Sequence, residues 1–180
     1  PITATAPLPA PVATPRASPA TAGQLRFELE SRCWAVRTDF DDGMGGKAIY
    51  RITARYESPH NQLYSEVSVV EGTDYPSALR NAVSAVRTKL RLPPFAADAA
   101  APACDDAARQ RLEQRCWTYR IDYHRSGSGT SYEILARADA PREQSGTRTL
   151  LVRAGDLDAA VDQIMQDLPH SGAEALPQAH

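Results

Sequence analysis

The chain contains almost the same nine-residue phrase twice, RCWAVRTDF at residues 32–40 and RCWTYRIDY at residues 115–123. The similarity continues on both sides of the phrase and keeps its order along the chain. The matching segments are LESRCWAVRTDF (29–40) with LEQRCWTYRIDY (112–123), YRITAR (50–55) with YEILAR (132–137), and LRNAVSAVRTKL (79–90) with LDAAVDQIMQDL (157–168). Ordered matches over most of two segments predict an internal repeat, so we expect two copies of one small module.

Each copy opens with a pattern that is typical of a β-hairpin. In the repeated phrase, every second residue is apolar or β-branched, which predicts a half-buried strand. One face of this strand carries Trp34, Val36, Thr38 and Phe40 in the first copy and Trp117, Tyr119, Ile121 and Tyr123 in the second. Glycine-containing turns at 41–46 and 125–129 lead to a second alternating segment, and a third strand is expected at 62–70 and at 147–154.

The closing segment of each copy has a helical period. Its apolar residues fall on one stripe, formed by Leu79, Ala82, Val83, Val86 and Leu90 in the first copy and by Leu157, Ala160, Val161, Ile164 and Leu168 in the second. The expected helix caps are Ser77 or Asp74 for the first closing helix, Asp156 for the second, and Asp105 for a short helix before the second phrase. The predicted fold is α+β, with two tandem α-β-β-β-α repeats whose antiparallel sheets are each covered by a C-terminal helix and packed as a pseudo-twofold pair.

Composition divides the chain into five segments. We expect a disordered Pro/Ala/Thr/Ser-rich tether at 1–23, a first module at 24–92, a Pro/Ala-rich linker at 93–104, a second module at 105–170 and a flexible tail at 171–180. Each module has only about 65 residues and buries little surface by itself, so the two modules are expected to pack on each other.

The charge and the N-terminal segment bear on partners and compartment. The formal net charge is −2, and neither module has the excess of positive charge that binds a phosphate backbone. No apolar run approaches 18 residues, so no transmembrane segment is predicted. The first residue is Pro1, after either a trimmed methionine or a removed segment. A Pro/Ala-rich stalk favours the bacterial cell envelope or periplasm, with a lipid anchor upstream of Pro1, over the cytoplasm or a virion.

Several charged residues recur on the other face of the predicted hairpin, opposite the apolar residues. In each repeated phrase the cysteine is the first residue on this face. The recurring charged residues are Arg37 and Arg120, Asp39 and Asp122, and Arg55 and Arg137. One interpretation is cross-strand charge pairing that keeps the outer face soluble and in register. The other is a recognition surface, because a planar guanidinium can grip a carboxylate or a phosphate with two hydrogen bonds.

The cysteines and tryptophans of the phrase also recur. Cys33 and Cys116 are expected as small core residues, or as disulfide partners in an oxidising compartment, with Cys104–Cys116 as the other pairing. Metal binding is not predicted, because there is no C-x-x-C motif and no histidine near either cysteine. Trp34 and Trp117 share a strand face with apolar residues, so we expect both to anchor the core.

No arrangement of residues predicts catalysis or a cofactor. His60 and His124 occupy unrelated positions in the two copies, and the glycine-rich stretches connect strand to strand, unlike a phosphate-binding loop. We therefore expect a non-enzymatic protein-binding or assembly module on a flexible tether, such as an envelope adaptor, an inhibitor or immunity-type binder, or a virion component. Nucleic-acid binding through the repeated arginines and aromatics is the alternative. A small hydrolase with a cleft between the modules comes third.

Overall fold

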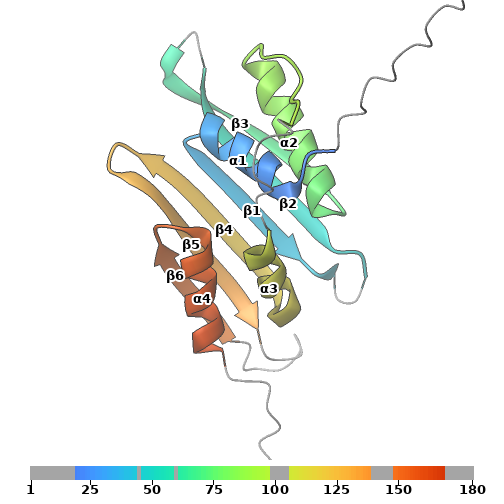
Figure 1. The fold of residues 1–180 in the computed structure, drawn as a ribbon, viewed down its shortest axis with the longest axis vertical. Helices are drawn as coiled ribbons and strands as arrows, with labels where there is room; N and C mark the ends of the chain where they lie inside the picture. Colours follow the sequence, from blue (N-terminus) through green and yellow to red (C-terminus); the bar gives the residue numbers. More distant parts are fainter. Residues whose placement is uncertain (1–18, 44–45, 59–60, 98–105, 139–147, 169–180) are drawn as a thin grey trace, which may run out of the picture.

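The computed structural model describes residues 19–43, 46–58, 61–97, 106–138 and 148–168 (Figure 1). Its elements are α1 (Ala22–Arg32), β1 (Ala35–Asp41), β2 (Ile49–Ser58), β3 (Asn61–Gly72), α2 (Tyr75–Lys89), α3 (Ala107–Arg115), β4 (Cys116–Ser126), β5 (Gly129–Ala138), β6 (Arg148–Ala154) and α4 (Leu157–Asp167). The fold is mixed α+β, as expected, and the order helix, three strands, helix occurs twice along the chain. The expected tail, most of the tether and part of the linker lie outside the described residues.

The strands form one antiparallel sheet in the order β3-β2-β1-β4-β5-β6 (Figure 1). The sequence predicted a separate sheet for each half, and this part of the prediction is wrong, because β1 and β4 pair directly with each other. The pairing runs from Ala35 opposite His124 to Asp41 opposite Thr118. It gives hydrogen-bond partners to backbone groups that would be exposed at the edges of two separate sheets. The two halves are therefore joined by main-chain hydrogen bonds as well as by side chains.

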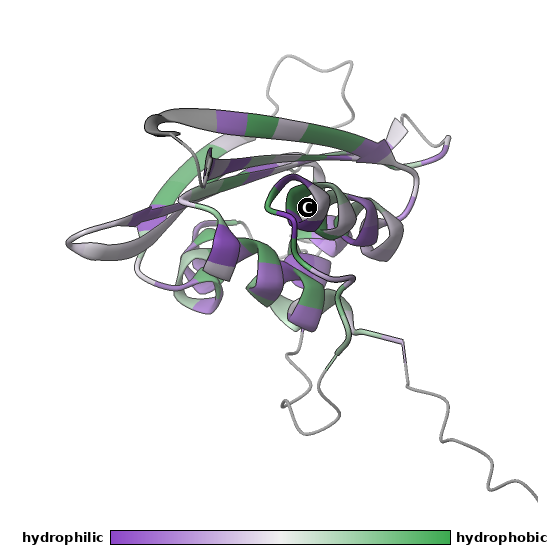
Figure 2. Cartoon of the chain, turned by 90° about the horizontal axis from the view of Figure 1, so that it is seen from above, coloured by the Kyte–Doolittle hydropathy of each residue, from purple (hydrophilic) through white to green (hydrophobic). Residues whose placement is uncertain are grey.

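All helices of the described chain lie on one face of the sheet (Figure 2). α2 packs on β2 and β3, and α4 packs on β5 and β6. Between these helices and the sheet lies a core that includes Ile52, Tyr56, Leu79, Ile134 and Ile164, each of them nearly or completely buried. The alternating faces predicted for the first and second strands of each half are confirmed by this burial, apart from the cysteines and tryptophans. The opposite face of the sheet carries no described helix.

Local capping explains where the helices begin. Asp74 accepts a hydrogen bond from the backbone N–H of Ser77 and Asp156 accepts one from that of Ala159, which confirms both residues as helix caps. Thr21 and Gln24 form a capping box at the start of α1. Asp106 is the residue that precedes α3, whereas Asp105 lies outside the described residues.

A bulge at the start of each repeated phrase reverses the predicted faces of the cysteines and tryptophans. Trp117 is an extra residue between the pairs Cys116–Ala138 and Thr118–Arg137. In the first half, the backbone N–H of Trp34 donates to the carbonyl of Arg55, which is already opposite Ala35. An extra residue shifts the alternation by one, so both cysteines face the core. The prediction that Trp34 and Trp117 are core anchors is wrong, since both are only half-buried.

None of the described helices has the length and apolar content that crossing a membrane requires.

Candidate binding surface

The side chains on the helix-free side of the sheet form a surface that we call the open face. The strand register assigns to it Ala35, Arg37 and Asp39 of β1, Arg51, Thr53, Arg55 and Glu57 of β2, Val67, Val69 and Glu71 of β3, Thr118, Arg120, Asp122 and His124 of β4, Glu133, Leu135 and Arg137 of β5, and Thr149, Leu151 and Arg153 of β6. All of the binding residues predicted from the sequence lie on the open face. The sequence placed them on two hairpins, and the β1–β4 pairing brings them onto one surface.

Two reciprocal ion pairs occupy the centre of the open face. Arg37 Nε donates to Asp122 Oδ1 at 2.6 Å, and Arg120 Nε donates to Asp39 Oδ1 at 2.8 Å. Each pair joins β1 to β4, so each takes one residue from either half of the chain. The hydrogen bond and charge of Asp39 raise the pKa of Arg120. The repeated charges thus stabilise the junction between the halves.

The charged rows continue toward both edges of the sheet. Arg51 lies between Asp39 and Glu71 in the register and binds Glu71 at 2.5 Å. On the other side, Arg153 pairs with Glu133, which is next to Asp122. Arg51 and Arg153, like the central Arg37 and Arg120, each have a carboxylate neighbour. The open face consequently has a mixed charge pattern.

The other two repeated arginines contact the tryptophans. The guanidinium carbon of Arg55 lies 5.7 Å from the ring centroid of Trp34, and that of Arg137 lies 5.7 Å from the ring centroid of Trp117. This distance is within the range of a cation–π interaction. Each half therefore has an arginine–tryptophan contact at its bulge, and the two contacts lie at opposite ends of the sheet.

Exposed apolar side chains lie on both edge strands of the open face. Val67 and Val69 on β3 are 51% and 55% exposed, and Leu151 on β6 is 60% exposed. Leu151 lies opposite Leu135, so the apolar surface extends inward from the β6 edge. Single exposed apolar residues are common on proteins. Here they are placed at both edges of one uncovered sheet, next to the paired charges.

A second set of polar residues lies on the side of the sheet that the helices cover. These residues were not predicted as a group from the sequence. Arg26 and Glu30 of α1 form an ion pair at 3.1 Å, and the Tyr132 hydroxyl from the other half donates to Glu30 at 2.8 Å. Burial raises the pKa of Glu30, although the charge of Arg26 lowers it in part. Burial also raises the pKa of the Tyr132 hydroxyl. This group holds α1 against a strand of the second half.

The corresponding residues of α3 make a similar group. Arg109 binds Asp106 at 2.5 Å and also pairs with Glu113, which accepts a hydrogen bond from the Tyr119 hydroxyl at 2.9 Å. The Arg109 guanidinium lies 3.9 Å from the ring centroid of Tyr75 in the first half. A signal was present in the sequence, because Arg26 and Arg109, like Glu30 and Glu113, are separated by the same 83 residues as the repeated phrase.

Both described cysteines are buried, and Cys33 is a free thiol. Burial, more than any charge, raises the pKa of Cys33 to about 12. Cys33 lies just before β1 and Cys116 is the first residue of β4, and these two strands run in opposite directions, so the register places the cysteines near opposite ends of the β1–β4 pair. A disulfide needs Cα atoms within about 7 Å of each other, which this arrangement does not provide. Cys104 lies outside the described residues, and its pairing with Cys116 stays a prediction.

The residues considered for catalysis and metal binding are not assembled into a site in the described part of the chain. His124 lies on the open face opposite Ala35, while His60 is outside the described residues. Within the described ranges, no group of three or more histidine, cysteine, aspartate or glutamate side chains is placed to hold a metal ion.

Comparison with protein-family models, curated proteins and solved structures finds no match to this chain.

Proposed function

We propose that this protein is a non-enzymatic binding or assembly module that recognises a protein partner through its open face. The observation that carries the proposal is the combination of an uncovered sheet with exposed apolar side chains, Val67, Val69 and Leu151, on both edge strands. Apolar contacts supply affinity when a partner covers them, and neighbouring charges set register and specificity. The predicted N-terminal tether at 1–23 would give the module reach or anchorage.

The edge strands offer a second means of attachment. β3 and β6 each have a strand neighbour on one side only in the described sheet. Their outer backbone groups can pair with an extended segment of a partner, a mode of recognition in which main-chain hydrogen bonds supply affinity and side chains supply specificity. The exposed Val69 and Leu151 lie on these same strands.

We further propose that the two halves are copies of one module related by an approximate twofold axis between β1 and β4. The reciprocal pairs Arg37–Asp122 and Arg120–Asp39 support this arrangement, because exchanging the halves converts one pair into the other. The repeated Arg–Trp contacts at opposite ends of the sheet support it as well. Such a protein presents two related but diverged surfaces to its partner.

Nucleic-acid binding is the second candidate. It is favoured by the position of Trp34 and Trp117, which are half-buried beside arginines of the open face, since aromatic and arginine side chains can stack on bases. The pairing of Arg37 and Arg120 with carboxylates argues against it, because those charges are already neutralised within the protein. A protein partner therefore remains our first proposal.

The test is a pull-down from lysate of the source organism with the full chain, before and after nuclease treatment. The variant Val69→Asp with Leu151→Asp places two charges on the apolar edges of the open face. A matched control, Asn81→Asp with Gln163→Asp, changes two exposed positions on the helices. We expect a protein that the parent and the control retain and the open-face variant loses. Equal capture by all three proteins would contradict the role of the open face, and loss of capture after nuclease treatment would favour nucleic-acid binding.

A further inference from the structure

One corner of the sheet, beside the end of α1, contains a pocket of about 560 Å³ that the proposed function does not use. It lies where β1 begins, β2 ends and β4 turns into β5, and it is lined by Arg32, Trp34, Glu57, Arg125, Ser126 and Gly127. The volume is within the usual range for ligand-binding pockets. Arg55, which lies over the Trp34 ring, adds a third positive charge beside the two lining arginines.

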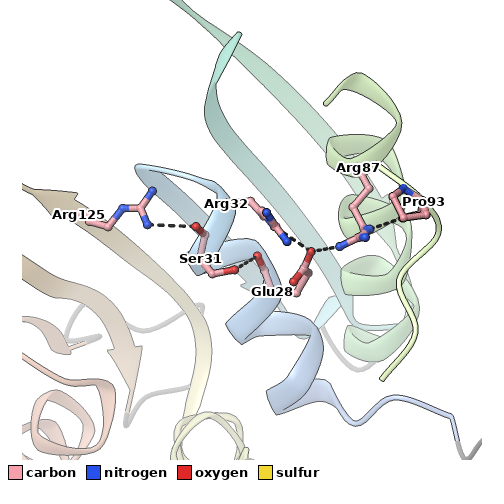
Figure 3. A network of polar contacts seen from close by, with 6 residues as sticks. All are labelled: Glu28, Ser31, Arg32, Arg87, Pro93 and Arg125. Carbon is pink, nitrogen blue, oxygen red and sulfur yellow. Dashed lines mark hydrogen bonds and ion pairs between the residues drawn. The ribbon is translucent and has the colours of Figure 1, made fainter. Parts of the chain in front are cut away.

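Contacts with α1 hold both lining arginines in place (Figure 3). Arg125 Nη1 donates to the carbonyl of Ser31 at 3.1 Å, and Arg32 Nε donates to Glu28 Oε1 at 3.2 Å. Glu28 also pairs with Arg87 of α2, so one carboxylate is shared by two guanidinium groups. A guanidinium has five N–H donors, and the contacts of Arg32 and Arg125 described here use one donor each. Both side chains are thus positioned with further donors at the pocket that they line.

The opposite corner of the sheet provides a natural comparison. The backbone N–H of Arg125 donates to the carbonyl of Trp34 at 2.8 Å, and that of Asp42 donates to the carbonyl of Trp117 at 3.0 Å. Residues 125 and 42 therefore occupy equivalent places, each beside a tryptophan that an arginine covers. The side chain at this place is positive at the Trp34 corner and negative at the Trp117 corner. The two corners share a backbone arrangement and differ in the sign of a charge.

We infer that the pocket at Trp34 binds a carboxylate of an acidic peptide segment, which the corner at Trp117 does not. Arg32 and Arg125 would hold the carboxylate through charge-assisted hydrogen bonds, and the Trp34 ring would contact the apolar part of the segment. The Glu57 carboxylate on the pocket wall disfavours a doubly charged phosphate more than a singly charged carboxylate. The inference rests on the proposed function in one respect, because the acidic segment belongs to the protein partner.

The test uses the two tryptophans of the chain as separate reporters. In the full chain, Trp117→Phe leaves Trp34 as the fluorophore at the pocket, and Trp34→Phe leaves Trp117 at the opposite corner. The probe is an acetylated tetraglutamate peptide, with inorganic phosphate as the second ligand. We expect saturable binding of the peptide reported by Trp34, no change reported by Trp117, and weaker binding of phosphate. Arg125→Asp, which copies the opposite corner, is expected to weaken peptide binding at least about tenfold.

Three results would overturn the inference: unchanged peptide affinity in Arg125→Asp, equal responses of Trp34 and Trp117, or tighter binding of phosphate than of the peptide. Arg125 is exposed, so we expect Arg125→Asp to fold. Its circular dichroism spectrum is compared with that of the parent as the control for folding. Arg125→Gln removes the charge without reversal, and it is expected to bind with intermediate affinity. The pull-down variant Val69→Asp with Leu151→Asp should still bind the peptide. Failure of the pocket is thereby distinguished from failure of the open face as a protein-binding surface.

Discussion

Arg37 of β1 donates a 2.6 Å hydrogen bond to Asp122 of β4 and so joins the two halves of the sheet. The Asp122 side chain is 15% exposed, which limits solvent screening, whereas Arg37 is 40% exposed. We expect a double-mutant cycle with Arg37→Ala and Asp122→Ala to give a coupling energy of about 0.5–1 kcal/mol, measured by urea unfolding.

The related pair Arg120–Asp39 is a matched control for this cycle. Its side chains are 44% and 29% exposed, so solvent screens the interaction more strongly. The coupling energy of this pair should be smaller than that of Arg37 and Asp122. Equal coupling energies for the two pairs, or no coupling between Arg37 and Asp122, would contradict the expectation that burial strengthens the Arg37–Asp122 pair.

The continuous sheet predicts that both halves unfold together. Separation of β1 from β4 would expose two strand edges and remove the contacts of Tyr132 with Glu30, so a partly unfolded form should be poorly populated. Single-tryptophan variants report each half separately, because Trp34 and Trp117 belong to different halves. We expect coincident urea transitions of their fluorescence. Two transitions with different midpoints would show that the halves are independent domains.

The tryptophans should contribute less to stability than the aliphatic core. Trp34 is half-buried beside Arg55, so Trp34→Ala is expected to lower the free energy of unfolding by about 1–2 kcal/mol through lost packing and a lost cation–π contact. Ile134 is fully buried, and Ile134→Ala should cost about 2–5 kcal/mol. A larger loss for Trp34 than for Ile134, measured by chemical unfolding, would mean that the tryptophan is a core residue after all.

The Cys33 thiol should be almost unreactive in the folded protein. Its pKa is about 12 instead of 9.0, which lowers the thiolate fraction near pH 8 by roughly a thousandfold, and its side chain is fully buried. Maleimide labelling of a Cys104→Ser variant, followed by peptide mass spectrometry, should modify Cys33 rapidly in denaturant and very slowly without it. Rapid modification of the folded protein would contradict the buried position of Cys33.

Glu30 should make stability depend on pH in a defined direction. Its folded-state pKa is raised above the ordinary 4.5. The contribution of Glu30 to the free energy of unfolding is therefore fully present below pH 4.5 and is lost as the pH rises through the folded-state pKa. Glu30→Gln removes the titration. We expect the stability advantage of the parent over this variant to shrink between pH 4 and pH 7 in urea unfolding. An advantage that grows over this range would mean that the folded-state pKa is lowered.

Periodicity and repetition in the sequence were sufficient to predict most local structure. The period of two around Val36 and Phe40, the helical stripes from Leu79 and Leu157, and the caps Asp74 and Asp156 all describe interactions between residues close in the chain. Such interactions have the same geometry wherever the element lies in the fold. Strand and helix types, and most of the buried faces, therefore followed from the sequence.

The candidate site depended on two features that local patterns do not contain. One is the bulge at Trp34 and Trp117, which shifts the alternation by one residue and moves the cysteines into the core. The other is the pairing of β1 with β4, which places Arg37 beside Asp122 and makes one sheet from two hairpins. The sequence by itself determined which residues could form strands and helices. Only the tertiary structure decided which strand edges meet, because that choice depends on contacts between residues 77–89 positions apart in the chain.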